Sequence, residues 1–161
     1  MTSSARKTMT EENTIVTPKL KRGLEDYISY WEKLSSRSIR LIEKSAHPLF
    51  HYTCHFYDTN GIGDFEAMLT HLYKNIGRMK IKITDRAWGT DNHTAYLRWS
   101  CHVHSPNFKK EWIFNGMSEV ALSDDGKIMS HIDHWDTGKQ FYLRLPLIGW
   151  LIRKTLRKMF K

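Results

Sequence analysis

Two residues in one short stretch, His131 and Asp133, have side chains that can take up or release a proton. The stretch from Gly126 to Asp136 follows a turn signal and alternates in residue type, which predicts a β-strand. Side chains of a strand point to its two faces in turn. One predicted face carries Met129, His131, Asp133 and Trp135, and the other carries Ile128, Ser130, Ile132 and His134. In a sheet that curls around a cavity, aromatic walls would desolvate the carboxylate, so we expect a raised pKa for Asp133 that suits proton transfer.

The same residues also fit a purely structural role. Asp133 and His131 can pair with each other, or with nearby backbone groups, and so satisfy a buried polar patch. Nine histidines raise the question of a metal, and His102 and His104 share a strand face. However, His131 and His134 point to opposite faces of a regular strand, so one chelating set would need ligands from several elements. We therefore expect no bound metal.

Apolar spacing predicts helices in the first half of the chain. Thr17 and Pro18 form a helix start, with a capping hydroxyl and a proline at the first helical position. Apolar residues at three- and four-residue spacing predict a helix that runs to residue 34 and a short helix around 39–42. A further helix is expected to begin at Asp64 and to end at Gly77.

The second half of the chain alternates with period two and predicts a sheet. Strands are expected over 50–57, 79–83, 95–103, 112–122 and the stretch with Asp133, and a loop over 58–63. Short connections make this an antiparallel meander, and the order of elements gives an α+β fold with the helices on one face of the sheet. We divide the chain into a flexible N-terminal tail (1–17), a single domain (18–145) and a C-terminal helix (146–161).

Composition restricts the class of protein. The chain has 161 residues, 40% of them hydrophobic, which is a globular composition. It has no apolar run that would span a membrane and no secretory signal, so we expect a cytoplasmic protein in which Cys54 and Cys101 are reduced. Residues 1–136 hold 18 Lys and Arg against 17 Asp and Glu, whereas residues 137–161 hold seven cations and no acid. A neutral body with a basic tail argues against a nucleic-acid partner.

The basic tail predicts an amphipathic helix. Apolar residues fall on one side of this helix, and the cations Arg153, Lys154, Arg157, Lys158 and Lys161 crowd the remainder. A helix of this kind with a tryptophan can lie in a membrane interface, and peripheral contact with a membrane is one expectation. In the alternative, the helix closes the mouth of a cavity or packs against a second subunit.

Several short motifs carry a resemblance to a known superfamily. They are the Trp31 region of the first helix, Phe56-Tyr57-Asp58, the helix opening at Asp64, Phe114-x-Gly116-x-Ser118-Glu119-Val120, Asp125-Gly126-Lys127-Ile128 and His131-x-Asp133-x-Trp135-Asp136. From about residue 20 to 145, the chain resembles the nuclear-transport-factor-2-like superfamily. The resemblance is to its SnoaL-like (polyketide-cyclase-like) and ketosteroid-isomerase-like branch.

The resemblance implies a cone, in which a strongly bent antiparallel sheet wraps over the N-terminal helices and encloses a pocket. It also implies a homodimer formed through the outer face of the sheet. Expected pocket residues are Trp135, Trp99, Phe56, Trp31 and His55. Limonene-epoxide-hydrolase-like members place an acid like Asp133 on the last strand, but they also use an Arg-x-Asp pair. Here Arg98-Trp99-Ser100 stands in that place, which argues against epoxide hydrolysis.

We predict a protein that binds a small apolar molecule in the cone. Asp133 would catalyse a cofactor-free proton transfer of the isomerase, dehydratase or cyclase type, with His131 orienting it. The alternative is a non-catalytic dimeric binding or adaptor module that docks to a membrane surface or to a partner. In that module, the docking residues would be Arg153, Lys154, Arg157 and Lys158 of the C-terminal helix.

Overall fold

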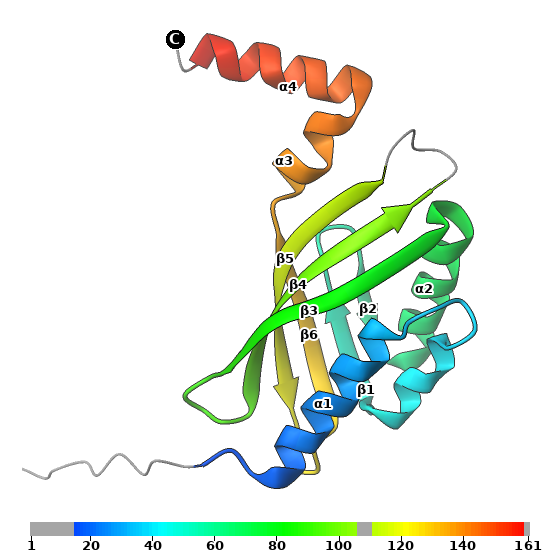
Figure 1. Ribbon diagram of the computed structural model, residues 1–161, viewed down its shortest axis with the longest axis vertical. Helices are drawn as coiled ribbons and strands as arrows, with labels where there is room; N and C mark the ends of the chain where they lie inside the picture. The colour runs from blue at the N-terminus through cyan, green and yellow to red at the C-terminus, as the bar shows by residue number, and fades with distance from the viewer. Residues whose placement is uncertain (1–14, 106–110, 160–161) are drawn as a thin grey trace, which may run out of the picture.

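Two helices cover one face of a curved six-stranded sheet in the computed structural model of the chain (Figure 1). The structure describes residues 15–105 and 111–159; residues 1–14 of the predicted tail, and Phe160 and Lys161, lie outside the described residues. In chain order the elements are α1 (Pro18–Glu32), η1 (Ile39–Lys44), β1 (Ala46–Thr53), β2 (Asp58–Asn60), α2 (Ile62–Ile76), β3 (Arg78–Trp88), β4 (Thr94–His104), β5 (Trp112–Leu122), β6 (Ile128–Trp135), α3 (Thr137–Gln140), η2 (Tyr142–Arg144) and α4 (Pro146–Met159), where η marks a 3-10 helix. The predicted α+β class and bent sheet are confirmed.

The strands lie in the order β2-β1-β6-β5-β4-β3. Strands β3 to β6 form the predicted antiparallel meander. Strand β1, however, runs parallel to β6, so the prediction of a wholly antiparallel sheet is wrong at this pair. The chain leaves β1 for β2, α2 and the whole meander before it returns beside β1, and this long route permits a parallel pairing that a hairpin does not.

An irregularity in β6 changes which side chains face the core. Leu122 pairs with Ile128 and Ala121 pairs with Ser130, so Met129 is an extra residue in the strand. A bulge of this kind locally rotates the strand. Ile128 is therefore fully buried and Met129 only half-buried, and the predicted faces of these two residues are wrong.

The helix ends follow local capping chemistry. The Thr17 hydroxyl accepts a hydrogen bond of 3.3 Å from the Leu20 amide, as predicted. Helix α2 begins earlier than predicted, with Gly61 at the N-cap position in a left-handed conformation (φ 88°), and Asp64 lies in the first turn. The predicted loop before it contains β2, because Asp58–Asn60 pairs with Thr53 to His51 at the edge of the sheet.

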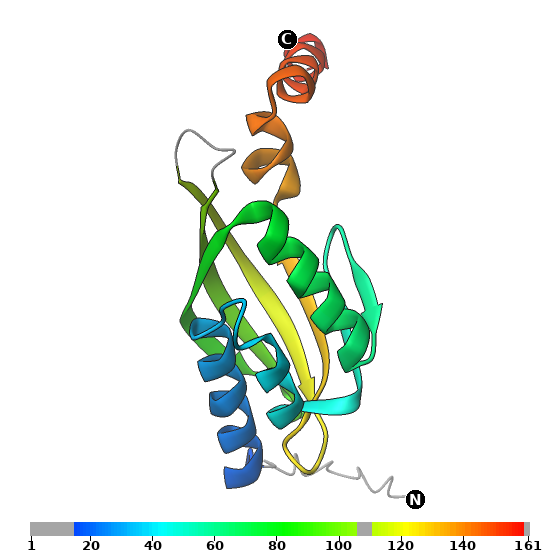
Figure 2. The same cartoon turned by 90° about the vertical axis from the view of Figure 1, so that its right-hand side faces the viewer.

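Aromatic rings fill the space between the helices and the sheet. Tyr27 and Trp31 on α1 meet Phe50 on β1 and Phe65 on α2, with ring centroids 5.2 to 6.5 Å apart. These contacts are mostly edge-to-face, the geometry that aromatic pairs prefer. All four rings are buried, so one continuous cluster fixes α1 and α2 on β1. Figure 2 shows both helices in front of the sheet.

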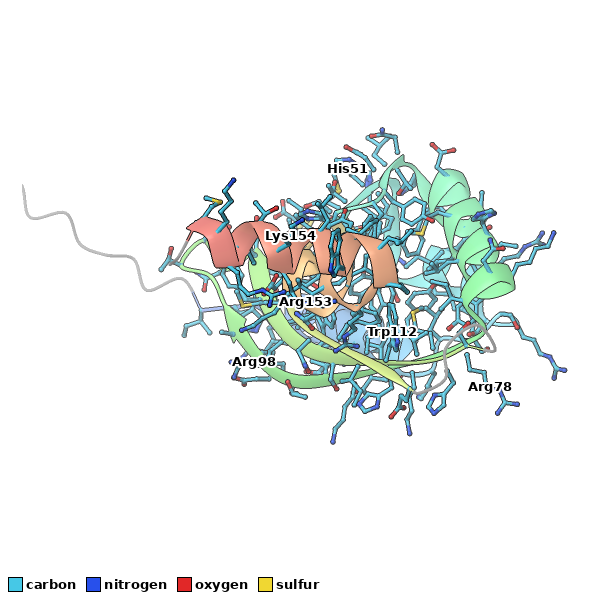
Figure 3. All side chains as sticks on the ribbon, turned by 90° about the horizontal axis from the view of Figure 1, so that it is seen from above. His51, Arg78, Arg98, Trp112, Arg153 and Lys154 are labelled. Atoms are coloured by element: carbon cyan, nitrogen blue, oxygen red, sulfur yellow. The ribbon has the colours of Figure 1, made fainter. Side chains whose placement is uncertain are left out.

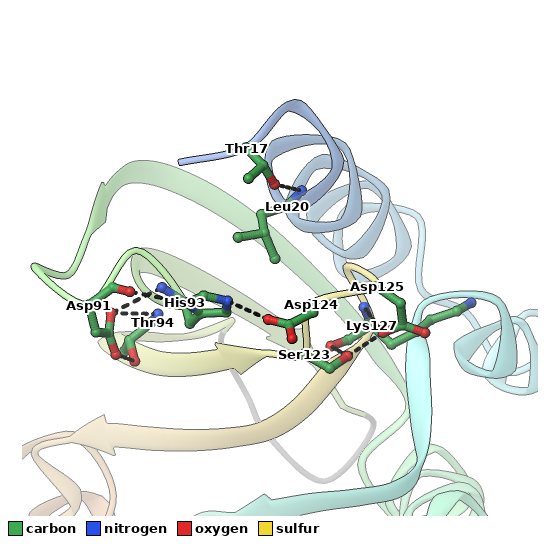
Figure 4. A network of polar contacts seen from close by, with 9 residues as sticks. All are labelled: Thr17, Leu20, Asp91, His93, Thr94, Ser123, Asp124, Asp125 and Lys127. Carbon is green, nitrogen blue, oxygen red and sulfur yellow. Dashed lines mark hydrogen bonds and ion pairs between the residues drawn. The ribbon is translucent and has the colours of Figure 1, made fainter. Parts of the chain in front are cut away.

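A polar network joins the turns of the β3–β4 and β5–β6 hairpins (Figure 4). Asp91 accepts hydrogen bonds from the amides of His93 (3.1 Å) and Thr94 (2.9 Å) in the β3–β4 turn. The ring of His93 lies 2.9 Å from the Asp124 carboxylate and so connects this turn to the β5–β6 turn. The network holds two adjacent hairpin turns together.

Helix α1 approaches the β5–β6 turn so closely that neither partner has room for a side chain. A Cβ on Gly23 would overlap the backbone carbonyl of Gly126. Gly126 itself has a left-handed backbone (φ 80°).

We predict that Gly23→Ala lowers the free energy of unfolding by about 1–3 kcal/mol, because the added methyl forces α1 away from the turn. The matched control is Gly63→Ala in α2, where an added Cβ meets nothing within 4 Å. There the better helix propensity of alanine should raise the free energy of unfolding by up to about 1 kcal/mol. Urea titration of both variants measures these changes, and a shift in the same direction for both would contradict the packing argument.

Candidate functional site

The carboxylate of Asp133 receives hydrogen bonds from three strands. The Tyr52 hydroxyl on β1 donates to Oδ2 at 2.7 Å, and the Ser118 hydroxyl on β5 donates to Oδ1 at 2.5 Å. Nε2 of His131, on β6 itself, lies 2.8 Å from Oδ1. Because a carboxylate can only accept, Nε2 of His131 carries a proton in this arrangement.

The network continues on both sides of the carboxylate. Nδ1 of His131 lies 2.7 Å from the Tyr27 hydroxyl on α1, which fixes the imidazole ring from behind. The Trp99 indole on β4 donates to the Ser118 hydroxyl at 2.8 Å, so Ser118 accepts one hydrogen bond and donates another to Asp133. Five side chains from five elements thus position one carboxylate.

The ionised form of Asp133 is favoured, contrary to the expectation of a raised pKa. Burial alone raises the pKa of Asp133, but the charge and hydrogen bond of His131 and the hydrogen bonds of Ser118 and Tyr52 together hold it below the ordinary 3.8. Desolvation by the aromatic walls raises this pKa as expected, but the hydrogen-bond donors outweigh its effect. Burial raises the pKa of Tyr52 well above 10.0, so its hydroxyl stays protonated and remains a donor.

A cavity of about 180 Å³ adjoins the carboxylate. Its walls are almost entirely apolar, and no Lys or Arg of the described residues lines it. The lining residues come from α1 and α2, from five strands, from the β1–β2 connection and from the segment between α3 and η2: Trp31, Tyr52, Cys54, Phe56, Tyr57, Met68, Leu69, Leu72, Ile76, Met79, Ile81, Ile83, Leu97, Trp99, Cys101, Val103, Phe114, Ser118, His131, Asp133, Trp135 and Phe141. The side chain of Asp133 is 14% exposed, which leaves part of a buried charge facing this space.

One end of the cavity reaches the surface. Phe56, which is 43% exposed, packs against Trp135 and Phe141 with ring centroids 5.8 and 5.2 Å apart, and Phe114 packs against Trp135 at 5.3 Å. We call these four residues (Phe56, Phe114, Trp135 and Phe141) the aromatic rim. At the other end, Trp31, Leu97 and His131 are buried.

Gly116 sets the position of two tryptophans. It pairs with Trp99 on one side and with Trp135 on the other. A Cβ on Gly116 would overlap the Trp99 indole, so the absence of a side chain lets this ring lie across β5 and reach Ser118. The glycine therefore supports the hydrogen bond that Ser118 donates to Asp133.

Most of the residues predicted for a pocket gather at this cavity. Trp31, Phe56, Trp99 and Trp135 line it together with His131 and Asp133. His55 does not, and its predicted position is wrong: it lies in the turn after β1, exposed, with its ring against Phe56. The four cations predicted to dock are all exposed on α4, away from the cavity.

The described residues contain no group of three or more His, Cys, Asp or Glu side chains placed to hold a metal ion. His102 and His104 share an outer strand face, where both rings approach the Glu111 carboxylate, at 3.1 and 3.2 Å. Burial raises the pKa of the Cys101 thiol in the cavity wall to about 12, so this sulfur is a poor nucleophile.

Sequence reasoning did not identify Tyr27, Tyr52 or the contact of Ser118. Ser118 alternates with more exposed residues and shares one face of β5 with Val120 and Leu122, and this alternation was the available signal. Tyr27 belongs to the apolar stripe of α1, where an aromatic residue is most simply a packing residue. Only the folded arrangement shows that its hydroxyl holds an imidazole.

Comparison by sequence finds no matching family model and no match among curated proteins. Comparison by structure finds many matches. An NTF2-like protein of unknown function from Exiguobacterium sp. 255-15 is 14% identical, with 71% of this chain and 98% of that chain covered and a TM-score of 0.60. A protein with a ketosteroid-isomerase-like fold from Catenulispora acidiphila, in complex with trimethylamine, is 12% identical, with coverage of 83% and 98% and a TM-score of 0.63. An LEH-like epoxide hydrolase of M. tuberculosis is 15% identical, with coverage of 87% and 94% and a TM-score of 0.61.

The chain has the nuclear-transport-factor-2-like fold. SnoaL-like proteins are also among the matches, so the fold that the resemblance implied is confirmed. Identities of 12 to 15% mean that these matches carry the architecture and not an activity.

We predict that Ser118→Ala raises the pKa of Asp133, because the carboxylate loses its donor from β5. A carbon-13 NMR titration of the Asp133 carboxyl group measures the shift. The control is Ser100→Ala, which removes a hydroxyl from the outer face of neighbouring β4 and should leave that pKa unchanged. An unchanged pKa in Ser118→Ala would mean that the bond from Ser118 does not stabilise the charge.

Asp133 should also contribute to stability in a pH-dependent way. Because its pKa in the folded protein lies below the ordinary 3.8, its contribution is complete above that value and is lost as the pH falls through the folded pKa. Asp133→Asn lacks this contribution and leaves donors facing an amide, so we expect a loss of about 1–3 kcal/mol at neutral pH. The difference in free energy of unfolding between the wild type and Asp133→Asn, measured in denaturant titrations, should become smaller below pH 3.8. A difference that does not change with pH would contradict an ionised, stabilising Asp133.

Proposed function

We propose that this protein binds a small, largely apolar molecule in the cavity and moves a proton on it through Asp133. The observation that supports this most directly is a partly exposed carboxylate, in an apolar cavity that no Lys or Arg of the described residues lines. A group of that kind is expensive to bury, and hydrogen bonding to a ligand reduces the cost.

Oδ2 is the oxygen that a ligand would approach. Oδ1 already accepts from Ser118 and His131, whereas Tyr52 is the one donor to Oδ2 among the residues that the structure describes. A carboxylate oxygen has a second lone pair for a further donor. The ligand would therefore present an O–H, an N–H or an acidic C–H to Oδ2, while its apolar part contacts the aromatic walls.

The protonation state gives the direction of the reaction. An ionised Asp133 starts as a base, so the C–H bond next to a carbonyl would break and its proton would pass to Oδ2. Because the donors keep the pKa of this carboxyl low, the protonated group returns its proton readily, and it can do so to another atom of the same molecule. Proton return of this kind suits isomerisation, cyclisation or dehydration, and it requires no cofactor.

The size of the cavity limits the ligand. Cavities of about 150 Å³ hold benzene, so about 180 Å³ accommodates one ring with short substituents, and the open rim allows a longer tail to protrude. The similar protein solved with trimethylamine is consistent with a fold that accepts small organic molecules. A homodimer formed through the outer sheet face stays a prediction.

Native mass spectrometry of the freshly purified protein, followed by denaturing extraction, tests the proposal. We expect a small apolar adduct that is lost in Ile81→Trp, which fills the cavity, and kept in Lys82→Trp, which points to the outer face of the same strand. With the extracted compound as substrate, Asp133→Asn should abolish turnover while the fold is kept. An adduct that survives Ile81→Trp, or full activity in Asp133→Asn, would contradict the proposal.

A further inference from the structure

Helix α4 leaves its apolar side chains uncovered. It packs mainly on η2, where Gly149 is buried against the Leu143 carbonyl and Arg153 donates a hydrogen bond of 2.7 Å to the same oxygen. The rest of the helix is open: Leu147 is 83% exposed and Met159 is 69% exposed. Four further apolar residues of α4 are also exposed: Ile148, Trp150, Leu151 and Leu156. So much exposed apolar surface on one helix indicates a site of interaction with another surface.

The charge on α4 indicates what covers it. The helix carries Arg153, Lys154, Arg157 and Lys158, and no acidic residue occurs between 137 and 161. At about 3.6 residues per turn, one side of the helix carries Ile148, Leu151, Ile152, Leu156 and Met159. Trp150 lies among the cations of the other side, with the Lys154 ammonium 5.0 Å from its ring centroid. An exposed apolar face opposite a row of cations matches the interface of an anionic lipid layer. None of the described helices is long and apolar enough to cross a membrane, so α4 would lie in the plane of the surface.

The connection from α4 to the cavity is short and firmly held. Gln140 of α3 pairs with the backbone of Asn115 on β5, accepting at 2.6 Å and donating at 2.8 Å. Arg144 of η2 donates to the Ile113 carbonyl at 3.2 Å, with its guanidinium 5.6 Å from the Trp112 ring centroid. These contacts fix α3 and η2 on β5.

One residue of the same connection lines the cavity. Phe141, between α3 and η2, belongs to the aromatic rim and also packs against Trp112, with ring centroids 5.9 Å apart. Figure 3 looks onto this end of the molecule, where α4 is the outermost element. The rim and the uncovered helix therefore lie at one end of the protein.

We propose that α4 docks on an anionic lipid surface and, through η2, holds the aromatic rim against the bilayer, so that the cavity exchanges its ligand with the membrane. The ligand class is then a membrane-soluble apolar molecule with one polar end for Asp133. This last step rests on the proposed function of the cavity, whereas the docking of α4 does not.

Co-sedimentation with vesicles tests the docking. The full chain should bind vesicles of mixed phosphatidylserine and phosphatidylcholine and bind pure phosphatidylcholine weakly. Replacing Lys154, Arg157 and Lys158 by Gln should lower the partition coefficient on the order of 100-fold, since each cation near an anionic surface contributes roughly fivefold. The control replaces Lys21, Lys80 and Lys82, which are exposed on α1 and β3, and should change binding little.

Two substitutions separate insertion from attraction by charge alone. Leu151→Gln with Met159→Gln, both exposed on the apolar side, keeps every cation and should still reduce binding strongly, because the apolar face no longer enters the lipid. Full binding by this variant would point to an acidic protein or another anion as the partner and would overturn the proposal. Equal binding to neutral and anionic vesicles, or no binding to either, would overturn it as well.

The position of the rim is tested by quenching of tryptophan fluorescence with brominated phosphatidylcholine in the mixed vesicles. In Trp150→Phe, the tryptophan of α4 is absent, and we expect remaining quenching from Trp112 and Trp135 near the bilayer. Adding Gly149→Ala to this variant should abolish that quenching while sedimentation persists, because a Cβ at Gly149 overlaps the Leu143 carbonyl and displaces α4 from η2. Sedimentation without quenching in Trp150→Phe would show that α4 docks but the aromatic rim does not approach the bilayer, which contradicts the exchange of ligand with the membrane.

These lipid measurements do not depend on a ligand. An empty cavity would therefore refute the proposed function and leave the docking result unchanged.

Discussion

A negative charge beside an apolar cavity is the constraint on which the rest of this structure depends. A buried carboxylate without partners would lose more hydration energy than the fold can supply, so donors must surround it. Tyr52 comes from β1, Ser118 from β5 and His131 from β6, while Tyr27 on α1 holds the imidazole. The charge therefore ties the helix layer to three strands, and the position of α1 over the sheet is part of the same arrangement.

The parts of this site that depend on local pattern could be predicted from the sequence. Alternation along one strand puts His131, Asp133 and Trp135 on a common face, and it does so in the structure from Ser130 onward. The parts that depend on distant partners could not. Tyr52 and Tyr27 meet this face across 81 and 104 positions of sequence, and no periodicity relates them to it.

The errors in prediction have the same origin. The expected rise in the pKa of Asp133 treated burial as the only influence, although donors from other strands reverse its effect. The bulge at Met129 depends on how β5 and β6 pair and not on the composition of β6 alone. The parallel position of β1 depends on the route of the chain around α2. In each case, the missing information was the identity of a neighbour in space.

The central position of β6 has a consequence for the order of folding. It is the last strand along the chain, yet it lies between β1 and β5 in the middle of the sheet. Until residues 128–135 insert, β1 and β2 have no hydrogen-bonded strand pairing with the meander, and the rings of Trp31, Phe50 and Phe65 lack the cover of that strand. Pairings between distant segments form slowly, and surfaces that wait for them are prone to aggregation. A ribosome making this chain would therefore release most of the domain before either the core or the cavity can close, and both would close in one late step.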